Sequence, residues 1–366
     1  MQQVSIRQLQ GYMRQLVIIT HCYLNCVAMK SLVCINPGLF EYRDIPAPVL
    51  QKNNAILKIK RIGICGTDLH AYKGTQPYFN YPRILGHELA ADLIEADNAN
   101  DFVPGETVTF IPYFNCGKCV ACRNNKPNCC AQIKVAGVHI DGGMSEYISV
   151  PSAALIKNNG LNYDELAVVE PLAIGAHGIK LADIKPNEFV LVMGAGPIGF
   201  AAMQFAKLAD ATIIIMDVNE QRLQFSKQKL NIEHTLNPAT ENVFEKLRDI
   251  TNGDMANVVI DATGNQKAIN NGLQYLSHGG RFILIGLQKG ELTFSHPEFH
   301  KREATLKSSR NAIREDFITV INTIQKGLVN PADMITRKIN FADVKNAFET
   351  WLYTTNDLVK AIIKMD

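Results

Sequence analysis

The chain has 366 residues, enough for two domains, of which 47% are hydrophobic and 20% charged, as in an ordinary globular protein. The formal net charge is +2 and the two signs are mixed along the chain, which gives no basis for binding nucleic acid or a membrane surface. No run of about 20 apolar residues occurs, so no spanning helix is expected. The nine cysteines are odd in number and clustered, which favours metal binding in a reducing, cytoplasmic compartment over disulfides.

Residues 1–28 are interpreted as an extension ahead of the folded protein, because the segment MKS that begins at Met29 resembles a natural start. Arginines before a semi-apolar stretch are also typical of a signal peptide. However, His21 and Asn25 interrupt that stretch and no A-x-A cleavage site follows, so the extension is the preferred interpretation.

The chain up to about residue 155 is expected to be rich in β-strands joined by long loops. A first strand is predicted near residues 31–35. Residues 56–65 then alternate apolar and polar side chains, as a half-buried strand does. Further short strands are predicted at 89–96 and 106–112, with glycine and proline marking the turns between them.

From about residue 189, apolar strands alternate with helices. Strands are predicted at 189–194, 212–217, 257–263 and 281–286, and helices over 172–184, 197–209, 219–229 and 265–276. Such alternation indicates βαβ units and a parallel sheet, so the predicted fold class is α/β. An amphipathic helix over 314–328 and a closing strand in the last nine residues complete the pattern.

The stretch VLVMGAGPIGFAAMQFA carries G-x-G-x-x-G as Gly194, Gly196 and Gly199, with Pro197 and Ile198 between them. An apolar strand precedes the motif and an apolar helix follows it, which is the context of a dinucleotide site. The first glycine permits the tight turn, the second lets the backbone approach a pyrophosphate, and the third allows close packing of helix on strand. The phosphates would then lie at the helix N-terminus.

Three further residues are candidates for contact with the cofactor. Asp217 ends the second strand about 20 residues after the motif, where a carboxylate accepts hydrogen bonds from the adenosine ribose and repels a 2′-phosphate. NAD is therefore favoured over NADP, although Asp217 could also merely cap its strand. The nearby Arg222 could contact a phosphate. Asp261 ends a later strand at the same edge and is the weakest candidate.

The stretch NCGKCVACRNNKPNCC contains more than half of the cysteines. Cys116, Cys119 and Cys122 have C-x2-C-x2-C spacing, and the fourth thiolate would come from Cys129 or Cys130. Four thiolates in a short loop form a closed tetrahedral site, which is typical of structural zinc. The alternative is a knot of two disulfides.

A second, mixed set of ligands is scattered in the sequence. Cys65 ends a predicted strand, His87 and Glu88 are adjacent in LGHELA, and Glu170 lies in VVEPLAIG. One thiolate, one imidazole and one or two carboxylates form a zinc site with room for a substrate oxygen. Each residue alone has an ordinary structural explanation, but their joint occurrence beside a dinucleotide motif indicates catalysis.

Zinc and NAD together define a reaction class. Zinc lowers the pKa of a bound alcohol, and the carbon that bears the oxygen gives hydride to nicotinamide. Thr67, two residues after Cys65, could hydrogen-bond the alcohol. His70, five residues after Cys65, could pass the proton to solvent, although it could equally be a surface histidine.

These motifs jointly resemble the zinc-dependent medium-chain dehydrogenase/reductase family, and the match runs from about residue 30 to the C-terminus. The resemblance implies a GroES-like catalytic domain (29–180 and 310–366) and a Rossmann NAD-binding domain (181–309), with the active-site cleft between them. It also implies that Cys130 is the fourth structural ligand, and that Glu170 is a fourth or exchanging ligand of the catalytic zinc. Two zinc ions per subunit and one NAD are thus expected.

Within the family, GHE followed by VEPL resembles the polyol and threonine dehydrogenase branch. Longer stretches such as GTDLHAYKGTQPYFNYPRILGHE resemble the bacterial L-galactonate 5-dehydrogenase type, and GVHIDGGMSEY is shared with starvation-sensing-type dehydrogenases. The implied substrate is a sugar acid, or alternatively a polyol or L-threonine. A substrate carboxylate favours a cationic partner, for which Arg310, with Asn311 beside it, is predicted. The alternative for Arg310 is an interdomain salt bridge.

Two other functions compete with the enzyme. A binding module built on residues 116–130 would need one zinc per chain, and its near-neutral charge argues against nucleic acid. A zinc-free reductase or sensor would need only the NAD site, but the intact Cys65, His87 and Glu88 argue against it. The family further implies a homodimer or homotetramer, for which the apolar stretch RFILIGLQKGELTFS offers a pairing edge.

Overall fold

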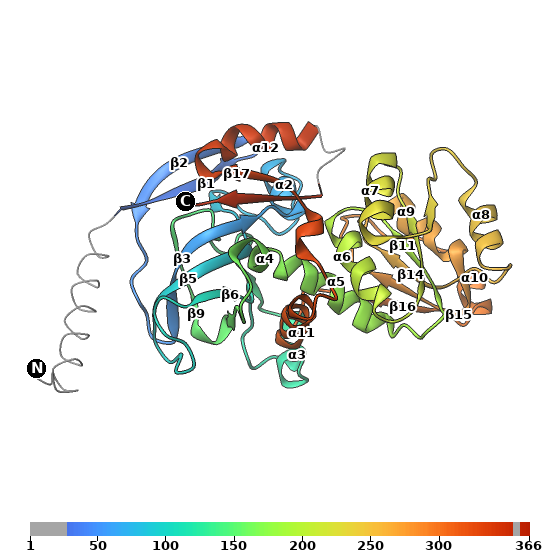
Figure 1. The fold of residues 1–366 in the computed structure, drawn as a ribbon, viewed down its shortest axis with the longest axis horizontal. Coiled ribbons are helices and arrows are strands. Elements are labelled where there is room, and N and C mark those ends of the chain that lie inside the picture. Colours follow the sequence, from blue (N-terminus) through green and yellow to red (C-terminus); the bar gives the residue numbers. More distant parts are fainter. Residues whose placement is uncertain (1–27, 354–358) are drawn as a thin grey trace, which may run out of the picture.

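The computed structural model describes residues 28–353 and 359–366, which form two parts placed side by side (Figure 1). The first part is built mostly on antiparallel strands and the second on a parallel sheet, so the predicted α/β class with two kinds of domain is confirmed. The extension predicted for residues 1–28 lies, but for its last residue, outside the described residues. Within the described ranges, no helix is both long and apolar enough to cross a membrane.

The β-rich part contains a seven-stranded sheet. Its strands, in spatial order, are β10 (Leu155–Lys157), β6 (Thr107–Phe110), β5 (Glu88–Ala96), β3 (Asn54–Gly63), β18 (Lys360–Lys364) and β17 (Ile335–Asn340), with β9 (Tyr147–Pro151) also paired to β3. A second sheet has the order β2 (Leu39–Pro46), β1 (Ala28–Asn36) and β4 (Arg83–Ile84), and β7 (Tyr113–Phe114) pairs with β8 (Lys134–Val135). The last strand of the chain therefore sits in the middle of the main sheet, next to β3.

The second part is a six-stranded parallel sheet. Its order is β13 (His234–Leu236), β12 (Thr212–Met216), β11 (Phe189–Met193), β14 (Ala256–Asp261), β15 (Leu276–Leu284) and β16 (Thr305–Ser308). The connecting helices are α6 (Pro197–Lys207), α7 (Glu220–Leu230), α8 (Val243–Ile250), α9 (Gln266–Gly272) and α10 (His296–Lys301). The strand order reverses between β11 and β14, and ligands of open α/β sheets bind outside the carboxyl ends of the strands at such a point.

The predicted helix over 265–276 was too long. Helix α9 ends at Gly272 and a single 3-10 turn follows, because β15 already begins at Leu276, where it pairs with Ala256 of β14. The short helix α2 (Gly66–Tyr72), inside a segment expected to be loop, was missed.

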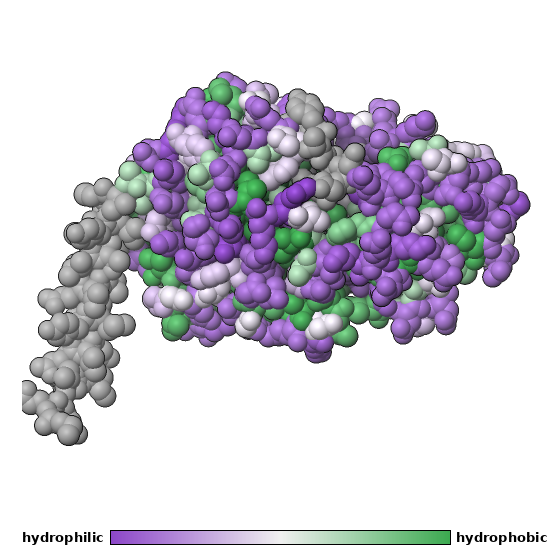
Figure 2. Space-filling model, turned by 45° about the horizontal axis from the view of Figure 1, so that its top comes forward, coloured by the Kyte–Doolittle hydropathy of each residue, from purple (hydrophilic) through white to green (hydrophobic). Residues whose placement is uncertain are grey.

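Helices α5 (Val169–Ala182) and α11 (Arg314–Gln325) lie where the two parts meet (Figure 1). A single cluster of buried side chains includes Leu172 of α5, Phe200 of α6 and Phe317 of α11, so the apolar core continues from one part into the other. Removing each such side chain from water contributes about 1.5–3 kcal/mol. The division into domains at residues 181 and 309 stays a proposal, and it assigns both helices to the β-rich part. On the face drawn in Figure 2, hydrophilic residues predominate.

Candidate active site and metal centres

Three of the predicted catalytic ligands meet at one end of the main sheet. Cys65 follows β3 and precedes α2, while His87 and Glu88 lie at the start of β5, and the two strands pair so that Gly63 faces Glu88. One ligand atom each from Cys65, His87 and Glu88 lies within 4.8 Å of the others. A thiolate, an imidazole and a carboxylate at this spacing are a donor set that fits zinc.

Glu170 approaches this group from the first turn of α5. Its side chain is buried, and the hydroxyl of the equally buried Tyr113 donates a hydrogen bond to it. Burial raises the pKa of Glu170 to about 7, with His87 opposing the rise and Glu88 adding to it. Glu170 is thus a neighbour of the metal ligands rather than part of their closest group, and its role as a fourth or exchanging ligand stays a prediction.

Lys360 was missed in the sequence although it lies inside the site. Its ammonium nitrogen is 2.6 and 2.7 Å from the two carboxylate oxygens of Glu88 and donates to the carbonyl oxygen of Ile64 at 3.0 Å. Burial alone would lower the pKa of Lys360, but the negative charge of Glu88 and its neighbours outweighs burial and raises it. The signal in the sequence was a lysine inside the apolar closing strand.

Asp68 is a second residue that sequence reasoning missed. It is fully buried, and its two oxygens accept the backbone N–H groups of Cys65, at 2.9 Å, and of Gly86, at 3.3 Å. One of these oxygens also lies 3.8 Å from Nδ1 of His87. Asp68 therefore ties together the two loops that carry the metal ligands and places a negative charge beside the histidine.

Helix α2 carries the two residues predicted to move the proton. Thr67 is half-buried near Cys65, whereas His70 is exposed one turn further on and its Nδ1 lies 2.9 Å from the hydroxyl of Thr75. Burial, Lys73 and Lys289 all lower the pKa of His70, so its imidazole is neutral at pH 7. A neutral, exposed imidazole can accept a proton, and the place of His70 in a proton path stays a prediction.

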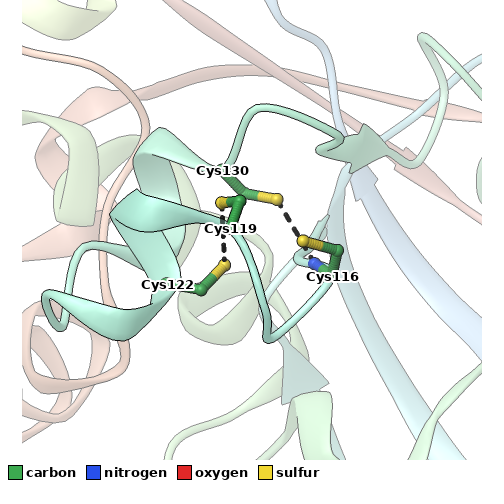
Figure 3. A group of neighbouring side chains, drawn as sticks. All are labelled: Cys116, Cys119, Cys122 and Cys130. Atoms are coloured by element: carbon green, nitrogen blue, oxygen red, sulfur yellow. Dashed lines mark hydrogen bonds between the residues drawn. The ribbon is translucent and has the colours of Figure 1, made fainter.

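The cysteine loop forms a second candidate metal centre. The sulfur atoms of Cys116, Cys119, Cys122 and Cys130 all lie within 4.8 Å of one another and point toward a common centre (Figure 3). The sulfurs of Cys119 and Cys122 are 3.5 Å apart, close to the separation of about 3.8 Å that a tetrahedral zinc–thiolate site requires. Cys129 is exposed and is not part of this group, and all five thiols of the loop are free, which argues against the disulfide knot.

Backbone N–H groups donate to the sulfurs of this loop and lower the pKa of Cys119, whereas the pKa of Cys130 is raised to about 11. The N–H groups of Cys116 and Gln132 each lie 3.3 Å from the sulfur of Cys130. Backbone donors at Cys122 and Ala131 lower the pKa of Cys119 to about 6. Such donors stabilise thiolates, the form that binds zinc.

The glycine motif has the geometry that its proposed roles require. Gly194 has a φ of +101°, in the region that favours glycine. A Cβ on Gly199 would lie 1.8 Å from the carbonyl oxygen of Gly194, whereas a Cβ on Gly196 would meet no atom within 4 Å. The loop thus packs tightly on its helix side and leaves open space at Gly196, where Pro197 and Ile198 begin α6. This open space over a helix N-terminus is a fitting place for a pyrophosphate.

The three further candidates for contact with the cofactor, Asp217, Arg222 and Asp261, differ in their surroundings. The carboxylate of Asp217 accepts the backbone N–H groups of Ala195, at 2.6 Å, and Asn219, at 2.8 Å, which holds it at the edge of the glycine loop. Arg222 lies in the first turn of α7, close to Asp217 in the chain. Asp261 is fully buried, and its oxygens accept bonds from Thr263 and Gly264 of its own loop, which it thereby shapes. Contact of Asp261 with the cofactor stays a prediction.

Arg310 and Asn311 lie in the crossover from β16 to α11. The side chain of Arg310 is exposed. Burial lowers the pKa of His139, and the positive charges of Arg310 and Arg83 lower it further. Asn311 adopts a φ of +52°, and its side-chain amide donates to the carbonyl oxygen of Asn128 at 3.1 Å. Asn311 thus holds the crossover against the cysteine loop.

Comparison with known proteins agrees with this geometry. The profile of the alcohol dehydrogenase GroES-like domain matches residues 51–160, and that of the zinc-binding dehydrogenases matches residues 197–326. The chain belongs to the zinc-type medium-chain alcohol dehydrogenase family. It is an NAD-dependent oxidoreductase that acts on CH–OH donors and uses zinc, so the readings as a zinc module or zinc-free sensor are set aside.

Individual relatives in the family are dehydrogenases of more than one type. The chain is 41% identical to the L-galactonate-5-dehydrogenase of Escherichia coli K12 over 92% of its own length and 98% of the relative's. It is 31% identical to an L-threonine 3-dehydrogenase of Pyrococcus horikoshii, over 88% and 94% of the two chains. An alcohol dehydrogenase of Escherichia coli CFT073, solved with NADH, superposes with a TM-score of 0.86 at 27% identity, covering 93% of this chain and all of that one.

Proposed function

We propose that the protein oxidises a secondary hydroxyl of a sugar acid, as its L-galactonate-5-dehydrogenase relative is named to do, and passes the hydride to NAD. The C–H bond at the hydroxyl carbon breaks, its electron pair leaves with the hydride, and the hydroxyl proton is released. Zinc held by Cys65, His87 and Glu88 would polarise the hydroxyl oxygen. Thr67 and His70 accept the proton in turn and pass it to solvent.

The observation that carries the choice of a sugar acid is the positive charge of Arg310 near His139, whose loop packs against the segment before the metal ligand His87. The loop that bears His139 packs against the segment just before His87, since a Cβ on Gly137 would lie 2.8 Å from the nitrogen of Gly86. The N–H of Val135 donates to Nδ1 of His139 at 3.1 Å, so the other ring nitrogen carries the hydrogen.

The positive charge of Arg310 acts on His139 from the crossover, beside that of Arg83. Arg83 is already paired with Asp141 at 3.2 Å, which leaves Arg310 as the cation for a substrate carboxylate. A donor on His139 would add a second hydrogen bond to the same group.

A substrate panel tests the proposal. NADH formation at alkaline pH would be compared for L-galactonate, L-idonate, D-gluconate, sorbitol, galactitol and L-threonine. We expect the highest kcat/KM with a sugar acid, and the alternative is a polyol or L-threonine dehydrogenase. The variant Arg310→Met should lose about tenfold to a hundredfold in kcat/KM on the acid and little on sorbitol, which serves as the uncharged control. Equal losses on both substrates would rule out carboxylate recognition by Arg310.

The same proposal includes a preference for NAD over NADP, assembly into a homodimer or homotetramer, and a cytoplasmic location. Asp217 at the edge of the glycine loop supports NAD over NADP. The stretch RFILIGLQKGELTFS, predicted as a pairing edge, is not one, because its strand β15 pairs with β14 on one side and β16 on the other. Strand β16 pairs only with β15 in the described sheet and is exposed along its length, which supports pairing into a homodimer or homotetramer there instead. Reduced cysteines support a cytoplasmic location.

A further inference from the structure

Asn128 lies on the cysteine loop but makes none of its hydrogen bonds to the metal ligands. It is buried within the short 3-10 turn Pro127–Cys129, just ahead of Cys130. Its side-chain amide nitrogen lies 2.8 Å from the carbonyl oxygen of Arg310 and 3.2 Å from Nε2 of His177. A buried polar side chain that reaches two other segments of the chain suggests a task beyond folding the loop.

These contacts fix the direction of every hydrogen bond. A carbonyl oxygen only accepts, so the amide NH2 of Asn128 must face Arg310, and its second hydrogen must go to His177. Nε2 of His177 is therefore an acceptor, and its ring hydrogen sits on Nδ1, which lies 2.7 Å from Asp316. Asp316 in turn accepts the N–H of Ile313 at 2.9 Å and so caps the start of α11.

The crossover returns a bond to the cysteine loop. The amide of Asn311 donates to the backbone carbonyl oxygen of Asn128 at 3.1 Å, and Asn311 holds a left-handed φ of +52° while doing so. Asparagine tolerates a left-handed φ better than most residues. The conformation still costs energy, so the contacts around Asn311 must hold it in place. Two hydrogen bonds of opposite direction thus join Asn128 to the crossover, one to Arg310 and one from Asn311. We call this pair of bonds the clamp.

We propose that Asn128 is a positioning residue, through which the loop folded by the structural zinc holds Arg310 in place for the substrate. The proposal rests on the proposed function, because Arg310 is there assigned to the substrate carboxylate. It gives the cysteine loop a part in substrate recognition, although its four thiolates leave no open position for chemistry. His177 on α5 and Asp316 on α11 anchor the clamp to the helices between the two domains.

The isosteric variant Asn128→Asp tests this directly, because it removes both N–H donors and sets an oxygen against the Arg310 carbonyl. We expect the KM for the sugar acid to rise about tenfold, since the lost contact is present in the ground state and the transition state alike. The kcat, the KM for NAD and the content of two zinc ions per chain should be retained. Asn124→Asp makes the same change at an exposed position of the loop and should leave all four quantities unchanged. A lower kcat at unchanged KM would show a merely structural role and overturn the proposal.

A milder variant covers the case in which Asn128→Asp does not fold. Asn311→Gly accepts the left-handed φ without strain and removes the bond to Asn128. It also removes a side chain predicted to lie beside the substrate, so a raised KM is read together with the hydrogen exchange described below. It should raise the KM for the sugar acid in the same direction, and an unchanged KM would count against the clamp.

Hydrogen exchange separates this proposal from the proposed function. In Asn128→Asp, or in Asn311→Gly, the amides of residues 309–316 should exchange faster than in the parent protein, whatever the substrate. Unchanged exchange there would overturn the clamp. If exchange rises but Arg310→Met leaves the KM for the sugar acid unchanged, the clamp holds the crossover and the assignment of Arg310 to the substrate fails, and with it the stated role of Asn128 in recognition.

Discussion

The ammonium nitrogen of Lys360 lies within 2.7 Å of both carboxylate oxygens of Glu88, and both side chains are shielded from water. A buried carboxylate without a partner is far less stable than a paired one. The residue that secures this metal ligand therefore comes from the final strand of the chain. The pair also fixes where the oxygens of Glu88 lie relative to Cys65 and His87.

Replacing Lys360 by Met should destabilise the protein by about 3–5 kcal/mol, because the charge of Glu88 would stay buried without its partner. The measurement is the free energy of unfolding from a urea titration, with zinc content determined in parallel. Lys364→Met on the same strand, at a partly exposed position, is the control and should change stability by about 0.5 kcal/mol or less. Equal effects of the two variants would show that the ion pair contributes nothing specific.

Replacing Cys65 by Ser should abolish turnover and lower the zinc content from two ions to one per chain, because the structural centre does not depend on Cys65. Metal analysis and circular dichroism would check that the fold remains. Cys129→Ser is the matched control: this thiol is exposed and outside the metal group, so both zinc ions and full activity should remain. Full activity of Cys65→Ser would refute the assignment of the catalytic centre.

The two glycines of the cofactor loop should respond differently to alanine. In Gly199→Ala the new methyl group would lie 1.8 Å from a carbonyl oxygen, so the melting temperature should fall even without cofactor. In Gly196→Ala the methyl group meets no protein atom within 4 Å, so the fold should survive while the Kd for NADH rises. Thermal unfolding and NADH fluorescence titration separate the two effects, and normal NADH binding by Gly196→Ala would contradict the phosphate site.

The lowered pKa of His70 predicts how its contribution depends on pH. Its imidazole is neutral, and can accept a proton, above a pKa that lies below the ordinary value of about 6.5. The parent enzyme should therefore exceed a His70→Gln variant in kcat, by up to about a hundredfold, at neutral and alkaline pH. This advantage should disappear as the pH falls through the pKa of His70. A ratio of the two rates that does not vary with pH would exclude His70 from the proton path.

How well a site could be predicted from the sequence depended on how close its residues lie along the chain. Cys116, Cys119 and Cys122 lie in one short loop, so their spacing alone indicated zinc. The choice between Cys129 and Cys130 came only from family resemblance, and in the structure Cys130 joins the group because the turn at Pro127–Cys129 directs its sulfur inward.

The residues that were missed act over long separations. Lys360 pairs with Glu88 and Tyr113 with Glu170 through sheet and helix packing that no local pattern encodes. Asp68, in contrast, caps the N-terminus of α2, and that helix was hidden within a segment that resembled a loop. The strands and helices predicted between residues 189 and 286 were found, since their periodicity is local. Strands β13 and β16 and helices α8 and α10 of the same part were not predicted, and helix α9 ends earlier than predicted.

The position of Lys360 also sets an order of events during synthesis. Glu88 leaves the ribosome 272 residues before its counter-ion, roughly 15–55 seconds earlier at ordinary elongation rates. The cysteine loop, in contrast, has all its ligands once residue 130 has emerged. We therefore expect the nascent chain to take up its two metals at different times, the structural ion early and the catalytic ion only after release. A transcript that lacks its last few codons would yield a polypeptide with an intact cysteine loop and no competent centre for chemistry.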